Sequence, residues 1–174
     1  MLEHREPDAR YLLKPVFIAQ QITRSHTIHL PAAPQEVFPL FSPLGEKHWV
    51  QGWEPEMLYP SSGVAQSGTV FTTQHANEPT RIWTIIAYAS EQAHVSYLNV
   101  LPGSHVSRIE VSCEAQGTQA TLARITYTLT ALTPQGNIYL DGFTEEYYQA
   151  YISSWETAIT HYLLHGHMLP HPEA

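Results

Sequence analysis

A series of alternating segments joined by short turns, followed by one long amphipathic segment, limits most strongly what this chain can fold into. The clearest alternation has apolar residues at the odd positions from Ala123 to Ala131 and polar residues at the even ones. This is the period of a strand that is buried on one face. Further strands are predicted over residues 68–75, 81–88, 94–101 and 106–114. Their turns are too short for crossover connections, so neighbouring strands must be antiparallel.

The region before these strands contains several prolines that limit the length of its strands and helices. Residues 16–30 contain many β-branched side chains and predict a first strand that ends at Pro31. A proline at position 34 with an acid close behind it indicates the start of a helix. Pro39 and Pro43 require that helix to be short. Residues 46–53 form either a second short helix or an irregular turn.

The last third of the chain has a helical period. Between residues 143 and 164 the apolar and aromatic positions are spaced by three and four, which predicts one long helix with an aromatic stripe. Thr144 is a suitable N-cap and Gly166 a suitable end. The stripe consists of Phe143, Tyr147, Ala150, Tyr151, Trp155, Ala158, Ile159, Tyr162 and Leu163.

Length and composition fit one globular domain. The chain has 174 residues, of which 43% are hydrophobic and 14% charged. A chain of this length buries enough surface to fold without a disulfide bond or a structural metal. Its single cysteine, Cys113, excludes an intramolecular disulfide. We expect one domain over residues 15–165, with residues 1–14 and 166–174 as weakly ordered extensions.

The charge balance argues against several classes of partner. The formal net charge is −8 with histidine neutral, which repels phosphate backbones and anionic membrane surfaces. No apolar run approaches the roughly 20 residues of a membrane span, and the acidic N-terminus is unlike a signal peptide. We therefore expect a cytoplasmic protein that binds no nucleic acid and has no membrane span.

The order of elements and one short segment resemble a known family. A strand, two short helices, a run of antiparallel strands and a long C-terminal helix is the order of the helix-grip fold. The segment Pro43-Leu44-Gly45-Glu46-Lys47-His48-Trp49-Val50-Gln51-Gly52-Trp53 resembles a Pro-x-Gly-Glu-x-x-Trp-x-x-Gly-Trp pattern in an uncharacterised branch of the START-like (SRPBCC) superfamily. That superfamily includes polyketide cyclases, lipid binders and Hsp90-activator-like domains.

The resemblance implies an α+β architecture over about residues 20–165. A curved antiparallel β-sheet would wrap around the long C-terminal α-helix, with two short helices after the first strand. It also implies a cavity between sheet and helix. The superfamily uses this scaffold for binding, transport and catalysis, so the fold alone does not select among them.

Eight aromatic residues are the candidate ligand-binding residues. Tyrosine and tryptophan combine a large apolar body with a hydrogen-bonding tip, which suits a pocket for a flat or greasy molecule. The alternative for each residue is that it fills the core beneath the helix. The set is Trp49, Trp53, Trp83, Tyr97, Tyr127, Tyr147, Tyr151 and Trp155.

Two polar pairs are weighed against simpler interpretations. Glu46 and His48 could form an acid–base pair at the cavity mouth, but their spacing on a helix points them apart, so we expect a solvated turn. Arg24 and His26 share the parity of Ile28, so a regular strand would aim them inward, where a ligand anion could meet them. A bulge or an earlier strand start would expose both, and we favour that reading.

No metal, cofactor or catalytic residue is assigned from the sequence. His161 and His165 have the helical spacing of two metal ligands, with His167 nearby. No Cys, Asp or third helix-borne His completes the set, so we expect only an adventitious site. The glycines form no nucleotide-binding pattern. Cys113 lies on the apolar face of its strand and should be buried and inert.

We therefore expect a domain that binds a small hydrophobic molecule, aromatic or lipid-like, in a cavity between the sheet and the C-terminal helix. One rival is a polyketide cyclase- or hydratase-like enzyme that uses cavity Tyr, His or Arg side chains. Another is a protein-interaction domain of the co-chaperone kind. The sequence leaves open the ligand, the choice between binding and catalysis, and whether the protein forms a homodimer.

Overall fold

The computed structural model describes residues 17–170, and its framework is a single antiparallel sheet. The predicted extension 1–14, and residues 171–174 of the C-terminal one, lie outside the described residues. The strands are β1 (Gln21–Leu30), β2 (Glu56–Tyr59), β3 (Val70–Thr73), β4 (Arg81–Ala89), β5 (His94–Leu101), β6 (His105–Ala115) and β7 (Thr121–Ala131).

The helices lie in three places along the chain. A short group follows β1, a single 3-10 turn joins β4 to β5, and two α-helices follow β7. Their bounds are α1 (Pro34–Val37), η2 (Phe38–Phe41), η3 (Gly45–His48), η4 (Ser90–Gln92), α2 (Pro134–Gly142) and α3 (Glu145–His165).

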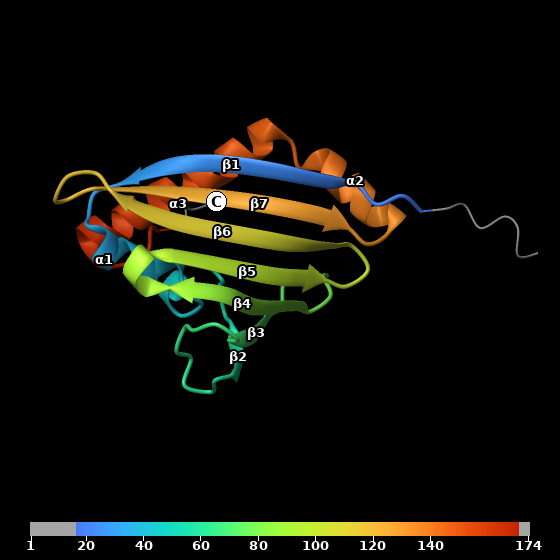
Figure 1. Ribbon diagram of the computed structural model, residues 1–174, viewed down its shortest axis with the longest axis horizontal. Coiled ribbons are helices and arrows are strands. Elements are labelled where there is room, and N and C mark those ends of the chain that lie inside the picture. Colours follow the sequence, from blue (N-terminus) through green and yellow to red (C-terminus); the bar gives the residue numbers. More distant parts are fainter. Residues whose placement is uncertain (1–16, 171–174) are drawn as a thin grey trace, which may run out of the picture.

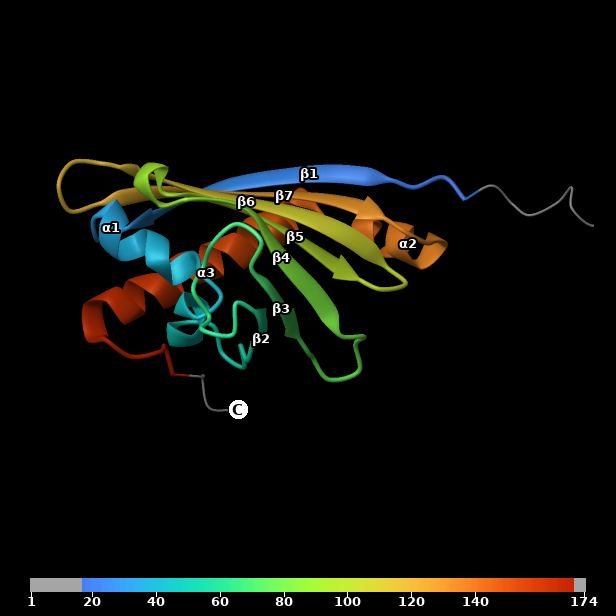
Figure 2. The same cartoon turned by 60° about the horizontal axis from the view of Figure 1, so that its bottom comes forward.

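The sheet is curved, and its concave face covers the helices. Its strand order is β1-β7-β6-β5-β4-β3-β2, with every neighbouring pair antiparallel. Figure 1 shows β1 and β7 running over α3 and α2, and in Figure 2 α1 and α3 lie beneath the sheet. The predicted helix-grip arrangement, a curved sheet around a long C-terminal helix, is confirmed.

The long helix is fixed at both ends as the sequence predicts. The Thr144 side chain accepts a hydrogen bond from the backbone N–H of Tyr147, and Gly166 ends the helix in the left-handed conformation, with φ of 74°. The face that packs on the sheet, however, is centred on Tyr148, Ile152 and Ile159, which are fully buried. The predicted stripe is therefore rotated by about one residue at its N-terminal end, where Tyr147 is 54% exposed.

Two elements are missing from the sequence interpretation. Strand β2 continues the sheet beyond β3. It has only four residues, so its sequence is too short to show a recognisable alternation. Helix α2 begins at Pro134, and its N-cap Thr133 accepts a hydrogen bond from the N–H of Gly136. That signal was present in the sequence. No helix in residues 17–170 is both long and apolar enough to cross a membrane.

Candidate ligand-binding cavity

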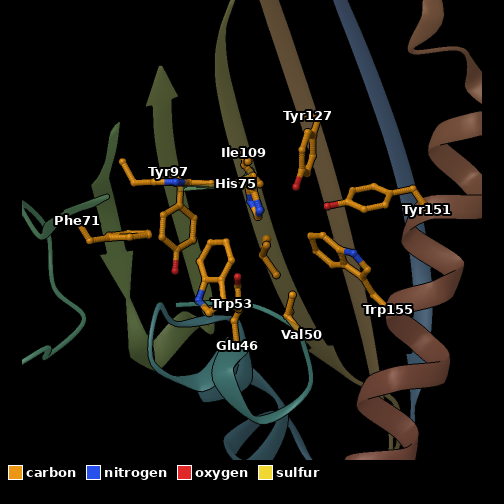
Figure 3. A pocket seen from close by; sticks show the side chains of 12 residues that line it. Glu46, Val50, Trp53, Phe71, His75, Tyr97, Ile109, Tyr127, Tyr151 and Trp155 are labelled. Atoms are coloured by element: carbon orange, nitrogen blue, oxygen red, sulfur yellow. The ribbon is translucent and has the colours of Figure 1, made fainter. Parts of the chain in front are cut away.

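A cavity opens between the concave face of the sheet and α3, with η3 at one end. Its inner section has a volume of about 140 Å³ and is mostly lined by apolar and aromatic surface (Figure 3). Six of the eight aromatic candidates line this section: Trp53, Trp83, Tyr97, Tyr127, Tyr151 and Trp155.

The floor of the cavity is one cross-strand row of the sheet. Tyr97 on β5 pairs with Ile109 on β6, and Ile109 pairs with Tyr127 on β7. Because paired residues point to the same face, all three side chains project toward the helix. The Tyr97 hydroxyl donates a 2.6 Å hydrogen bond to the carbonyl of Phe41, which ties the row to η2.

One wall is built from rings on β3, β4 and the segment after η3. Phe71 and Trp83, which pair across β3 and β4, are stacked with their ring centres 5.5 Å apart. Trp53 meets Trp83 edge-on at 5.6 Å and donates a 2.7 Å hydrogen bond from Nε1 to the carbonyl of Pro43. The indole of Trp53 is therefore held in place by both packing and a polar contact.

The opposite wall belongs to α3. Tyr151 and Trp155, one helical turn apart, have ring centres separated by 5.3 Å. Figure 3 shows the hydroxyls of Tyr151 and Tyr127 directed toward each other across the cavity. Burial raises the pKa of Tyr151 to about 12, and the nearby hydroxyl of Tyr127 opposes that rise. The pKa of Tyr127 is also raised, first by burial and further by its neighbours.

Glu46 supplies the acidic group of the inner section. It lies on η3, where the preceding Gly45 packs so closely that a Cβ would meet the carbonyl oxygen of Pro39. This approach sets the course of the turn, and Figure 3 shows the Glu46 side chain pointing into the cavity. The expected solvated turn is wrong for Glu46 and right for His48, which is exposed and stacks on Tyr162 with a centre distance of 5.1 Å.

The surroundings of Glu46 favour its neutral form. Burial raises the pKa of its carboxyl well above the ordinary value, and neither a positive charge nor a hydrogen-bond donor among the described residues offsets this. The side chain is half-buried, and it lines the inner section of the cavity. The negative charge of Glu46, when present, raises the pKa of Tyr97, Tyr127 and Tyr151 in turn, although burial is the larger cause for each.

An outer section extends the cavity toward α2. It has a volume of about 360 Å³, shares Trp53, Trp83, Tyr127 and other residues with the inner section, and adds Tyr147. It is more polar, because it includes Arg81. The guanidinium of Arg81 donates a 3.3 Å hydrogen bond to Asn99 and forms an ion pair with Glu78 at 3.7 Å.

Trp49 differs from the other candidates, because the structure places it in the core. It is 3% exposed, packs against Phe41 and Trp155, and donates a 2.8 Å hydrogen bond from Nε1 to the carbonyl of Leu40. It is absent from the residues that line the cavity. The turn after η3 directs Trp49 into the layer between η2 and α3, whereas Trp53 lines the cavity.

Arg24 and His26 point inward, which corrects the favoured expectation that a bulge exposes them. The register of β1 with β7 is unbroken from Gln21 to Leu30. Both side chains find partners in or just before α3. Arg24 donates to the carbonyl of Phe143 at 3.3 Å and lies 3.6 Å from the Glu145 carboxylate, and the His26 ring lies 3.3 Å from the Ser153 hydroxyl.

The sequence interpretation missed several lining residues. Ile109 and Val111 lie on the inward face of β6, so the strand alternation could have identified them as lining residues. Val50 and His75 lie outside regular elements, and nothing local marks them. The missed lining residues of the inner section are Glu46, Val50, Phe71, His75, Ile109 and Val111.

Metal-ligating and nucleophilic groups are weak candidates. No group of three or more His, Cys, Asp or Glu side chains within residues 17–170 is arranged to hold a metal ion. The rings of His161 and His165 do lie together, with centres 4.5 Å apart, on the exposed end of α3. Cys113 is buried, and burial raises the pKa of its thiol to about 12, so it is a poor nucleophile.

Comparison with solved structures identifies the fold. Norcoclaurine synthase from Thalictrum flavum superposes with a TM-score of 0.65 at 12% identity, covering 86% of this chain and 98% of that one. Ara h 8.0201 gives a TM-score of 0.54 at 16% identity, with 83% and 99% covered. DynU16, a protein of the dynemicin biosynthetic locus, gives 0.56 at 10% identity, with 83% and 48% covered.

These neighbours belong to the START-like superfamily, and this chain has their helix-grip fold. At 10–16% identity the likeness concerns the fold and not the chemistry. The sequence matches no protein-family model, and no curated protein matches it.

Proposed function

For this helix-grip domain we propose that the cavity binds a small hydrophobic molecule with at least one aromatic ring. The observation that supports this most is the inner section itself, where rings from the sheet and from α3 face a space of about 140 Å³. A cavity of about 150 Å³ lined by apolar side chains accepts benzene in another protein, so one ring fits inside. The outer section leaves room for a larger remainder.

Three further observations support ligand capture. The wall residues are held by their own hydrogen bonds, as Tyr97 and Trp53 show, so the site is largely pre-formed. One structural neighbour, norcoclaurine synthase from Thalictrum flavum, is solved in complex with the small aromatic molecules dopamine and hydroxybenzaldehyde. The open cavity favours this function over a co-chaperone-like domain that works through its surface.

Two measurements test the proposal. Native mass spectrometry of the protein as purified should reveal a retained small molecule, and benzyl alcohol should quench or shift the fluorescence of the cavity tryptophans. Val50→Trp fills the inner section and should abolish the fluorescence change. Ile86→Trp, a matched substitution at an exposed position of β4, should leave it intact. A response to benzyl alcohol that survives Val50→Trp would contradict the proposal.

A second candidate, acid–base catalysis, is favoured by the grouping of Glu46, Tyr127 and Tyr151. A carboxyl with a raised pKa beside two hydroxyls in an apolar space is suited to moving a proton on a bound molecule. If the retained molecule has an exchangeable C–H bond, incubation with protein in D₂O should raise its mass. Glu46→Gln should stop this exchange without preventing binding. Exchange that is equally fast with both proteins would reject the catalytic candidate.

A further inference from the structure

The inner section contains one feature that a purely apolar ligand does not use. The carboxyl of Glu46 projects among aromatic rings, and within residues 17–170 it has no salt bridge and no hydrogen bond. Its chain neighbour Lys47 is directed elsewhere, because its ammonium is paired with Glu54 at 3.2 Å. An acidic group removed from water without a partner is costly. A ligand that brings a partner therefore gains an interaction that the empty cavity lacks.

We propose that the ligand carries a cationic nitrogen, such as a protonated amine, which lies against Glu46 while its aromatic part occupies the inner section. This inference rests on the proposed function, because it names the chemical class of the molecule that the cavity binds. An ammonium supplies both the opposite charge and the N–H donors that the carboxylate lacks.

The walls reinforce this preference. Trp53, Trp83 and Trp155 present ring surfaces to the inner section, and a cation within about 6 Å of an aromatic face is attracted by its quadrupole. The formal net charge of −8 also favours the approach of cations. The one cation of the outer section, Arg81, is already compensated by Glu78.

The groups around Glu46 fix the sign of the pH dependence. The titratable side chains facing it are Tyr97 on β5, Tyr127 on β7, Tyr151 on α3 and His75 after β3. The tyrosines are neutral around neutral pH, because the pKa of each is raised by burial. A bound ammonium stabilises the carboxylate form of Glu46 and lowers its pKa again. Binding of the cation therefore releases a proton and tightens as the pH rises through the pKa of Glu46.

Three probes with the same ring separate charge from shape: benzylamine, benzyl alcohol and benzoate. Titration calorimetry on the whole chain at about pH 8 should show benzylamine binding at least about tenfold more tightly than benzyl alcohol, as expected for a partly buried ion pair. Benzoate should bind most weakly. Repeating the benzylamine titration in buffers of different ionisation enthalpy should reveal the released proton.

Two variants test whether the preference for benzylamine over benzyl alcohol depends on the Glu46 side chain. Glu46→Gln keeps the size of the side chain and should remove the advantage of benzylamine over benzyl alcohol. Glu56→Gln, at an exposed position of β2, should leave that advantage unchanged. Circular dichroism confirms that each variant is folded.

The outcomes distinguish the two proposals. Equal or tighter binding of benzyl alcohol, or an amine preference that persists in Glu46→Gln, overturns the cationic ligand and leaves the cavity function intact. If none of the three probes binds and no molecule is retained on purification, the proposed function fails, and this inference fails with it.

Discussion

The hydroxyl of Tyr148 on α3 donates a 2.7 Å hydrogen bond to the backbone carbonyl of Ile125 on β7. This contact lies in the fully buried layer between helix and sheet. It fixes the rotation of α3 about its own axis, which in turn sets Tyr151 and Trp155 against the cavity. The wall of the candidate site therefore depends on a residue outside it.

Removing that hydroxyl should reduce stability without opening the fold. Tyr148→Phe loses one buried hydrogen bond and should lower the free energy of unfolding by about 1 kcal/mol. Tyr147→Phe, its exposed neighbour, should change it by less than about 0.5 kcal/mol. Urea unfolding of both variants measures the difference. Equal losses would mean that the helix packs on the sheet through the other face.

The two tryptophans after Gly45 should behave differently from each other. Trp49→Ala empties a buried position and should cost about 3–5 kcal/mol of stability. Trp53 is only partly buried, so Trp53→Ala should cost less and should chiefly weaken the binding of benzyl alcohol. Thermal melting followed by fluorescence titration separates the two roles. A Trp49→Ala protein that melts normally and binds poorly would make Trp49 a cavity residue after all.

Glu46 should make the protein less stable as the pH rises. The pKa of Glu46 is raised in the folded state, so the folded state binds the proton more tightly than the unfolded one, and stability is lost as pH rises from the unfolded pKa through the folded one. Glu46→Gln should therefore be more stable than the wild type at about pH 8. The advantage should vanish near about pH 4.

Urea unfolding of Glu46→Gln and the wild type at both pH values checks this expectation, with Glu56→Gln as the control. A stability difference that is independent of pH would show that the Glu46 carboxyl is well solvated.

His105 should make the protein less stable as the pH falls, which is the opposite of the effect of Glu46. It is buried, it stacks on Tyr139 at 4.3 Å, and its Nε2 has no hydrogen-bond partner among the described residues. Burial, helped by the charge of Arg81, lowers its pKa from 6.5 to about 4. The unfolded state therefore binds the proton first, and stability should fall as the pH drops between these values.

The pH dependence of unfolding should be shallower in His105→Phe than in the wild type over that range. An NMR titration of the His105 ring gives an independent check. A ring that titrates at the ordinary value for histidine would rule out this explanation.

Removal of metal should have no effect on folding. His161 is half-buried and His165 exposed at the end of α3, and no group of three or more metal ligands is arranged within residues 17–170. Dialysis against EDTA should leave the melting temperature unchanged. A fall of several degrees that zinc reverses would be evidence for a structural metal.

The fold could be predicted from the sequence because its periods are long and clear. Strands β6 and β7 alternate over most of their eleven residues, and Thr144 and Gly166 mark the ends of α3. Short elements such as β2 lack enough repeats to be recognised. The predicted helical stripe includes Tyr147 and not Tyr148, because both are aromatic and only the packing on Ile125 decides between them.

The candidate site was less accessible to such reasoning. Aromatic type and inward parity identified Tyr97 and Tyr127, but neither feature could separate Trp49 in the core from Trp53 at the cavity. The sequence predicts that Glu46 is solvent-exposed, because it gives no sign of the close approach of Gly45 to Pro39 that sets the direction of the Glu46 side chain. That contact joins two turns of irregular backbone, where no periodic pattern exists to guide a prediction.

The contact between Gly45 and Pro39 also separates the charge of the cavity from most of its shape. The sheet and α3 supply most of the walls, with Val50 and Trp53 added from the segment after η3, whereas the acidic group of the cavity stands on η3 itself, next to Gly45. Most of the shape of the cavity is therefore encoded far along the chain from the residue that carries its charge. A substitution at position 46 would therefore change the charge of the cavity while leaving the aromatic residues that line it in place.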